Sequence, residues 1–153
     1  MANLNDKFDV IKGWEPGGDA SIDQSLPPKK VVGVPVTLLP GNLVTLDASG
    51  DLDVATTPAD VSASEAAALQ VYVVLEGNGV DTATQFVEKV VVLRGKLTVK
   101  IDKLQTAQTF GVTGRVTYDT GLLRDHAGTE QSIGYVLENN VAADGTIVVE
   151  LDL

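Results

Sequence analysis

Apolar and polar residues alternate along much of the chain, which is the pattern of β-strands with one face on a core. The strictest case is residues 96–101, where Leu97, Val99 and Ile101 alternate with Lys96, Thr98 and Lys100. This alternation predicts a strand that buries three apolar side chains and gathers two lysines on its outer face. The same reasoning predicts strands over residues 31–38, 43–46, 51–56, 90–94, 114–118, 132–138 and 146–153.

Several of these segments also predict which side chains are buried. In residues 31–38, one face carries Val32, Val34, Val36 and Leu38, while Pro35 lacks an N–H donor and favours a sheet edge. The two last strands are expected to bury two rows, which are Ile133, Tyr135 and Leu137, and Ile147, Val149, Leu151 and Leu153. Residues 71–75 are continuously apolar, which is typical of a strand covered on both faces.

Turn-forming residues separate the predicted strands. Ala48-Ser49-Gly50 predicts a hairpin between residues 43–46 and 51–56, and Asn78-Gly79 and Asp144-Gly145 mark further turns. Ser62 and Glu65 have the spacing of a capping box ahead of an apolar run, so we expect one short helix there.

These elements predict an all-β fold. We expect a single β-rich domain over residues 31–153, a compact barrel or sandwich of roughly 8–10 short strands with one short helix. Residues 1–30 are expected to form an extended N-terminal arm, because acids, glycines and prolines dominate them and Pro27-Pro28 stiffens their end.

The arm has four large apolar side chains that could hold it in place: Phe8, Val10, Ile11 and Trp14. Fixing the backbone of one residue costs about 1–2 kcal/mol, whereas burying one large side chain returns about 1.5–3 kcal/mol. Four anchors therefore do not offset the ordering of the whole arm. Two alternatives stay open: the arm docks on its own body, or it gains a long contact surface on a neighbouring subunit.

The amino-acid composition and the net charge exclude several classes of protein and of binding site. The 153 residues include no cysteine, which excludes a disulfide framework and a thiolate metal site, and the net charge of -10 argues against binding to nucleic acid. The sequence has neither an apolar run of about 20 residues nor a signal-peptide pattern, so we expect a soluble, non-secreted protein that does not associate with membranes. Lys96 and Lys100 belong to a locally basic stretch, which is either a solvated strand face or a contact with an acidic neighbour.

Candidate chemistry is sparse. His126 is the only histidine and lies in a polar loop without the neighbours of a catalytic triad. Residues 47–53 resemble the start of a calcium loop, but their glycine comes too early and Pro58 replaces the closing glutamate, so a hairpin turn is favoured. Gly77-Asn78-Gly79 lacks the helix and lysine of a phosphate loop. We therefore expect no enzymatic activity, no metal and no cofactor.

The aromatic residues bear on carbohydrate binding, which needs rings on an exposed face. Five of the seven lie in or beside apolar strand patterns and are expected in the core: Tyr72, Phe86, Phe110, Tyr118 and Tyr135. This leaves Phe8 and Trp14 in the arm. A carbohydrate-binding β module remains an alternative that depends on whether two aromatic rings share an exposed face.

Three segments resemble the head decoration proteins of tailed bacteriophages: residues 86–95 (FVEKVVVLRG), 133–138 (IGYVLE) and 144–150 (DGTIVVE). The similarity extends over most of residues 31–153 and consists of strands, glycines and a closing hairpin. It implies a capsid cement protein that binds the major capsid protein on the outer surface of the virion, often as a homotrimer, and is made in the host cytoplasm.

Under this resemblance, we expect the contacts with the capsid or a neighbouring copy to come from Phe8, Val10, Ile11, Trp14, Lys96 and Lys100. An acidic surface suits a position outside the shell, away from packaged DNA. A head-fibre base or a tail component is the alternative role within a virion.

Overall fold

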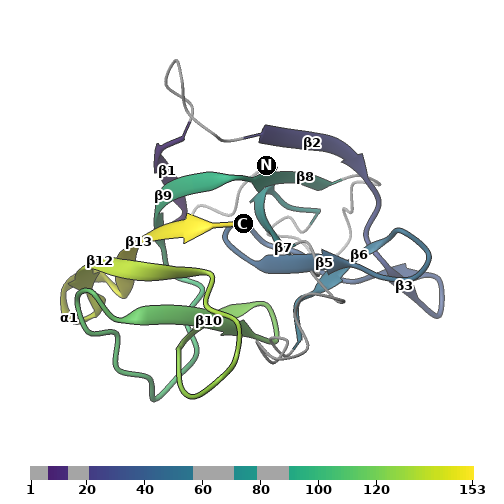
Figure 1. Cartoon of the computed structure of the whole chain (residues 1–153). Coiled ribbons are helices and arrows are strands. Elements are labelled where there is room, and N and C mark those ends of the chain that lie inside the picture. The colour runs from purple at the N-terminus through teal and green to yellow at the C-terminus, as the bar shows by residue number, and fades with distance from the viewer. Residues whose placement is uncertain (1–6, 14–20, 57–70, 79–89) are drawn as a thin grey trace.

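The computed structural model describes residues 7–13, 21–56, 71–78 and 90–153, and the statements below refer to these residues. They form two large antiparallel sheets and a small hairpin (Figure 1). The six-stranded sheet has the order β1 (Asp9–Lys12), β9 (Lys96–Ile101), β13 (Thr146–Asp152), β12 (Gly134–Asn140), β10 (Arg115–Asp119) and β11 (Leu122–Asp125). The five-stranded sheet has the order β2 (Ser21–Leu26), β8 (Val90–Arg94), β7 (Val71–Glu76), β5 (Leu43–Leu46) and β6 (Leu52–Val54). The hairpin pairs β3 (Lys30–Val31) with β4 (Val34–Pro35), and one short helix, α1 (Val141–Asp144), joins β12 to β13.

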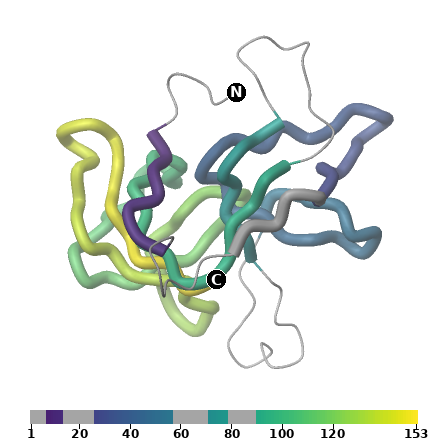
Figure 2. The backbone as a smooth tube through the Cα atoms, turned by 90° about the horizontal axis from the view of Figure 1, so that it is seen from above, coloured from purple at the N-terminus to yellow at the C-terminus, as the bar shows by residue number. Residues whose placement is uncertain are grey.

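The chain passes from one large sheet to the other at Gly95. β8 ends at Arg94 and β9 begins at Lys96, so a single glycine with a φ of 112° separates the two strands. Strands that switch sheets in this way make the corners of β-sandwiches. Figure 2 shows the two sheets next to each other, and neither closes on itself. The fold is therefore all-β, as predicted, and it is a sandwich rather than a closed barrel.

The main core lies between the two sheets. It combines fully buried side chains of the six-stranded sheet, such as Val99, Val116 and Ile147, with those of the five-stranded sheet, such as Leu43, Val73 and Leu93. A second cluster, which includes Leu38, Tyr72 and Val74, covers the other face of the five-stranded sheet. The five-stranded sheet is thus covered on both faces, which confirms the expectation for residues 71–75. Along β9, in contrast, the side chains that point away from the core are polar.

The described parts of the N-terminal arm are edge strands of these two sheets. β1 pairs with β9 through Asp9↔Lys100 and Val10↔Val99, and β2 pairs with β8. Phe8 and Val10 are partly buried and pack against the main core. Backbone pairing with the chain's own body thus supplies contacts beyond the apolar anchors.

Residues 31–38 do not form the single strand that their alternation predicts. The register Val31↔Val34 leaves Val32 and Gly33 as a two-residue turn, with positive φ values of 53° and 78°. Positive φ at both central residues is the requirement of a type I′ hairpin turn. The apolar residues Val32, Val34, Val36 and Leu38 nevertheless keep a period of two in the sequence, so the turn leaves no break in the pattern.

The buried row predicted for β12 is also wrong in part. Ile133 is buried, but Tyr135 is 40% exposed and Leu137 is only partly buried, whereas Val136 is buried. The regular register pairs Tyr135 with Glu150 and Val136 with Val149, so Val136 faces the core and Tyr135 lies on the outer face of the six-stranded sheet. A bulge follows between Val136 and Glu138 and changes the orientation of the residues after Val136.

The remaining local predictions depend on turn residues. The hairpin of β5 and β6 is confirmed, and the Asp47 carboxylate caps its turn by accepting hydrogen bonds from the backbone N–H groups of Ser49 and Asp51. The helix predicted around Ser62 lies outside the described residues. β11 was not predicted, because residues 122–125 show no clear alternation. Within the described residues, no helix is long and apolar enough to cross a membrane.

Candidate functional site

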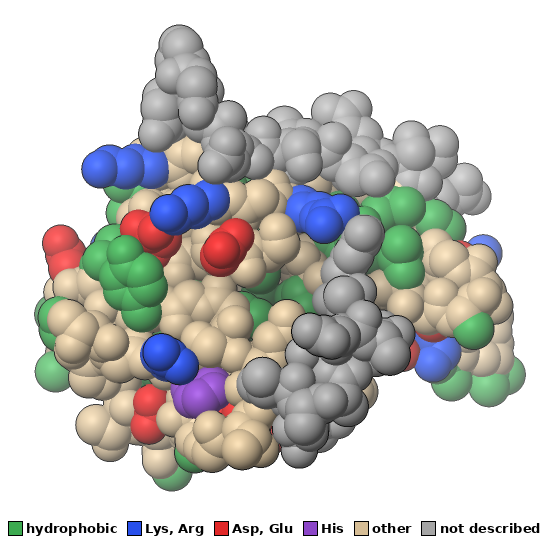
Figure 3. Space-filling view, viewed as in Figure 1, with side chains coloured by type: hydrophobic (Ala, Val, Ile, Leu, Met, Phe, Trp, Pro, Cys, Tyr) green, Lys and Arg blue, Asp and Glu red, His purple; other side chains and the backbone are tan. Residues whose placement is uncertain are grey.

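The outer face of the six-stranded sheet carries a row of polar side chains that crosses five strands. The cross-strand pairs Lys12↔Thr98, Thr98↔Glu150, Glu150↔Tyr135 and Tyr135↔Arg115 place these five residues side by side. Side chains opposite each other on neighbouring strands are close enough to interact. In Figure 3, basic and acidic side chains accordingly intermingle over β9 and β13. We call this set the transverse row.

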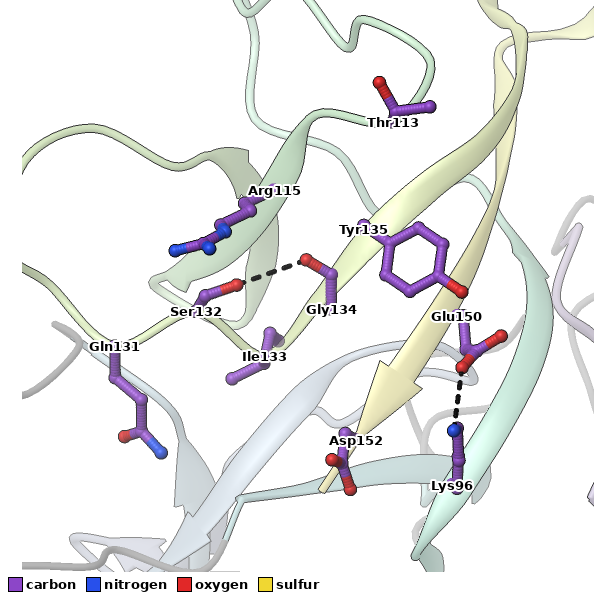
Figure 4. Close-up of a pocket in the computed structure, with 10 residues that line it drawn as sticks. All are labelled: Lys96, Thr113, Arg115, Gln131, Ser132, Ile133, Gly134, Tyr135, Glu150 and Asp152. Carbon is purple, nitrogen blue, oxygen red and sulfur yellow. Dashed lines mark hydrogen bonds and ion pairs between the residues drawn. The ribbon is translucent and has the colours of Figure 1, made fainter.

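Glu150 and Tyr135 of the row lie close to Lys96 on β9. The Lys96 ammonium lies 3.3 Å from Oε1 of Glu150, and the Tyr135 hydroxyl points toward the same carboxylate (Figure 4). The Tyr135 hydroxyl and the ammonium lower the pKa of Glu150, and the same carboxylate raises the pKa of Tyr135 and of Lys96. The carboxylate is therefore ionised at neutral pH.

A pocket of about 650 Å³ opens beside these three side chains. Its lining comes from β9, β10, β12, β13 and the segments that flank β10 and β12: Lys96, Thr113, Arg115, Gln131, Ser132, Ile133, Gly134, Tyr135, Glu150 and Asp152. Figure 4 shows Tyr135, Glu150 and Lys96 on one side of it and Arg115, Ser132 and Gln131 on the other, with Gly134 between them. The pocket thus has a hydrophobic ring on one side and hydrogen-bonding groups around it.

Gly134 allows the strands under the pocket to approach each other closely. A Cβ atom at this position would collide with the backbone carbonyl oxygen of Glu150. A glycine inside a strand often marks such an approach.

Three polar side chains in the pocket have unused hydrogen-bonding capacity. Arg115 and Asp152 form no side-chain hydrogen bond or ion pair within the described part of the chain. The Oε1 atom of Gln131 also has no hydrogen-bond partner there, but it is buried and does not face the open pocket. The exposed side chains of Arg115 and Asp152 therefore offer donors and acceptors to a bound molecule.

A second feature of the surface is the tip of the β3–β4 hairpin. Val31 and Val34 are more than half exposed, and Val32 is 98% exposed. Figure 3 shows hydrophobic side chains at the right-hand end of the molecule, where Figure 1 places this hairpin. We call Val31, Val32 and Val34 the valine tip. The alternation in residues 31–38 predicts one strand with Val32 and Val34 on the same face, so it does not reveal this exposed apolar group.

The residues predicted to contact a capsid lie in different environments. Phe8 and Val10 pack against the core, Ile11 is 50% exposed on the edge strand β1, and Trp14 lies outside the described residues. Lys96 pairs with Glu150, and the Lys100 ammonium lies 2.9 Å from Asp144. Both lysines thus have acidic partners in their own chain, and their contact with another protein remains a prediction.

The residues considered for catalysis or metal binding have structural partners. Nε2 of His126 lies 2.6 Å from the backbone oxygen of Glu130, whose carboxylate pairs with Arg124. The buried amide of Asn78 donates to the carbonyl of Val36 and accepts from the N–H of Leu38. Within the described residues, no group of three or more histidine, cysteine or acidic side chains is placed to hold a metal ion.

Comparison with known protein families, characterised proteins and solved structures finds no match to this chain. The surface described above therefore has to be interpreted from its own residues.

Proposed function

We propose that this chain is a structural virion protein that decorates the outer surface of a phage capsid by binding the major capsid protein lattice. The observation that carries the proposal is the conformation of Val32, which is 98% exposed at a φ of 53°. A β-branched residue is unfavourable at positive φ, and a type I′ turn prefers asparagine or glycine. An exposed valine with positive φ favours neither the solubility nor the folding of the isolated chain. A contact with another protein would account for it.

The valine tip has the properties of a small docking element. Its three side chains form an apolar projection, and exposed apolar groups of this kind mark contacts with other proteins. Burying one valine in a partner contributes about 1.5–3 kcal/mol. The exposed Lys30 beside the tip adds a positive charge that favours an acidic or polar rim on the partner.

The remaining predicted contacts take different roles in this proposal. Ile11 is accessible for direct contact, while Phe8 and Val10 act by holding β1 on the sheet. Lys96 and Lys100 would exchange their present partners for acidic groups of a neighbour, so they contribute less than unpaired lysines would. A single valine tip gives only a modest binding affinity. A homotrimer on a symmetry axis would bind more tightly, because three linked weak contacts add avidity.

Two further features support a decoration role, namely the resemblance to head decoration proteins and the net charge of -10. An acidic protein is repelled by packaged DNA and is suited to the exterior of the shell. The same features fit a head-fibre base or a tail component, so location in the particle has to be tested as well.

The proposal is tested by binding to purified phage heads that lack the protein. Val32→Asn preserves the turn and removes the apolar side chain, so we expect at least about 10-fold weaker binding to heads, which corresponds to about 1.4 kcal/mol. Val112→Ser is the matched control, because Val112 is also more than half exposed but lies in a loop away from the hairpin. Val112→Ser should bind like the wild type.

Unchanged binding of Val32→Asn would remove the hairpin from the interface. Electron microscopy of particles with bound protein would show a repeating array on the head if the chain is a decoration protein. Density restricted to fibres or tails would instead support the alternative. Deleting the arm is a poorer test, because it removes the edge strands β1 and β2 together with the packing of Phe8 and Val10.

A further inference from the structure

We propose that the pocket on the outer face of the six-stranded sheet binds a neutral sugar, with the ring of Tyr135 against the sugar and with Arg115 and Asp152 bonded to its hydroxyl groups. The inference does not rest on the proposed function. The pocket is lined by residues of the six-stranded sheet and its flanking segments, whereas the valine tip belongs to the separate β3–β4 hairpin.

The ring of Tyr135 is exposed beside the pocket. Its side chain is 40% exposed, and its hydroxyl points toward Glu150 (Figure 4). Among the described aromatic residues only Tyr135 is exposed, so two rings do not share this face and a single ring would contact the sugar. The face of an aromatic ring carries partial negative charge, which attracts the weakly positive C–H groups on one face of a pyranose.

The polar groups around the ring match the hydrogen-bonding capacity of hydroxyl groups. Arg115 offers only donors, and Asp152 offers only acceptors. A hydroxyl group both donates and accepts, so one ligand with several hydroxyls satisfies both side chains. Small-molecule sites usually combine an apolar surface with a small number of polar groups that point toward the ligand.

The charges argue against ionic ligands. Lys96 and Arg115 balance Glu150 and Asp152 in the pocket, so neither sign of charge is favoured locally. The net charge of -10 on the whole chain repels phosphates and carboxylates at longer range. A cation, in turn, would lie beside an arginine and a lysine.

The position of the pocket argues against an extended peptide. Peptides that bind by strand addition need a free sheet edge. The β12 strand under the pocket is paired with β13 on one side and, through Tyr135↔Arg115, with β10 on the other. Recognition here depends on side chains, which suits a compact polyhydroxylated ligand.

The test is a titration of the full ¹⁵N-labelled chain, followed by NMR. The probes are the methyl glycosides of glucose, galactose, mannose and N-acetylglucosamine, with methyl glucuronoside as the anionic probe. We expect at least one neutral glycoside to shift the amide signals of Gly134 and Tyr135, and to do so more than the glucuronoside does.

Variants identify the side chains that are responsible. Tyr135→Ala and Arg115→Ala should each weaken binding by at least about 10-fold, which is about 1.4 kcal/mol. Arg115 has no side-chain partner in the described structure, so its variant is expected to fold normally and keeps the test valid if Tyr135→Ala is destabilised. Lys30→Ala removes an exposed cation of the separate β3–β4 hairpin and should leave the affinity unchanged.

Three outcomes would overturn the inference. One is the absence of signal changes at the pocket with every neutral glycoside. Another is a preference for the glucuronoside, which would make Arg115 part of an anion site. The third is binding that survives both Tyr135→Ala and Arg115→Ala. None of these outcomes bears on attachment to phage heads, which is measured separately with Val32→Asn.

Discussion

The carboxylate of Asp144 lies 2.9 Å from the ammonium of Lys100, which ties the α1 turn to β9 across the intervening strand β13. The same carboxylate accepts hydrogen bonds from the backbone N–H and the hydroxyl of Thr146. One acidic side chain therefore holds the end of the β12–β13 connection against two strands.

This arrangement predicts a contribution to stability that depends on pH. The hydrogen bonds from Thr146 and the Lys100 ammonium lower the pKa of Asp144 from 3.8 to about 2. Because the folded-state pKa is lowered, the stabilisation is complete above the unfolded pKa and is lost as the pH falls from about 3.8 towards about 2. Asp144→Asn should therefore be less stable than the wild type at neutral pH, and the difference should disappear at the acid end of this range.

Denaturant unfolding of both proteins across this pH range would measure the effect. Lys100→Met provides a second variant that removes the ion pair and leaves the hydrogen bonds from Thr146. Its loss of stability at neutral pH should be smaller and should shrink with added salt, because the pair is partly exposed. A difference between wild type and Asp144→Asn that stays constant with pH would contradict the assignment.

The turn at Val32 predicts a stabilising substitution. Left-handed backbone costs an ordinary residue about 1–2 kcal/mol, and asparagine tolerates it better than valine. Val32→Asn should therefore raise the free energy of unfolding by about 1 kcal/mol, which shifts Tm by about 2–4 °C in a domain of this size. Val34→Asn, at a strand position, should give no gain in a thermal melt. A lower Tm for Val32→Asn would mean that the valine makes a stabilising contact within the chain.

Replacing Gly134 with alanine is expected to lower the stability of the protein strongly, although it adds only one methyl group. The added methyl group of Gly134→Ala would collide with the backbone of β13, which cannot move without disturbing the centre of the sheet. We expect a loss of about 2 kcal/mol or more in denaturant unfolding. Gly111→Ala is the matched control, because a Cβ atom there meets nothing and no unusual φ is required. Equal stability of the two variants would argue against the close approach of β12 and β13.

The buried hydrogen bonds of the Asn78 side chain are expected to contribute to the free energy of unfolding. Its amide satisfies the N–H of Leu38 and the carbonyl of Val36 from a fully buried position. Asn78→Ala leaves the Leu38 N–H without its partner, so we expect a loss of about 1–3 kcal/mol from that group alone. Asn140→Ala removes a solvent-exposed side-chain hydrogen bond to Glu138 and should change stability by no more than about 0.5 kcal/mol. Calorimetric melts of both variants would compare them.

The sequence predicts those strands and hairpins that depend only on neighbouring residues. β9 and β13 follow from strict alternation, and the β5–β6 hairpin follows from Asp47 and the Ala48-Ser49-Gly50 turn. The Val32-Gly33 turn was missed, because valine is not a turn residue and the alternation continues across it. A glycine in the middle of an apolar run was the available signal.

The candidate site could not be assembled from the sequence, because it depends on long-range strand order. Lys96, Arg115, Tyr135 and Glu150 come together only through the order β9–β13–β12–β10. The exposure of Tyr135 also depends on its pairing with Glu150 rather than with a core residue of β13, which no local pattern revealed. The glycine before Tyr135 was the one local sign that something unusual happens in this strand.

The pairing of β9 also bears on the rate at which the protein acquires its structure. This strand pairs with β1, which is much earlier in the sequence, and with β13, which is much later in the sequence. Loop closure over such separations is entropically unfavourable until the contacts form, and domains dominated by distant strand pairs reach the native state in milliseconds to seconds rather than microseconds. The six-stranded sheet is therefore expected to be completed in a late and slow step, during which its unpaired edges would be open to aggregation.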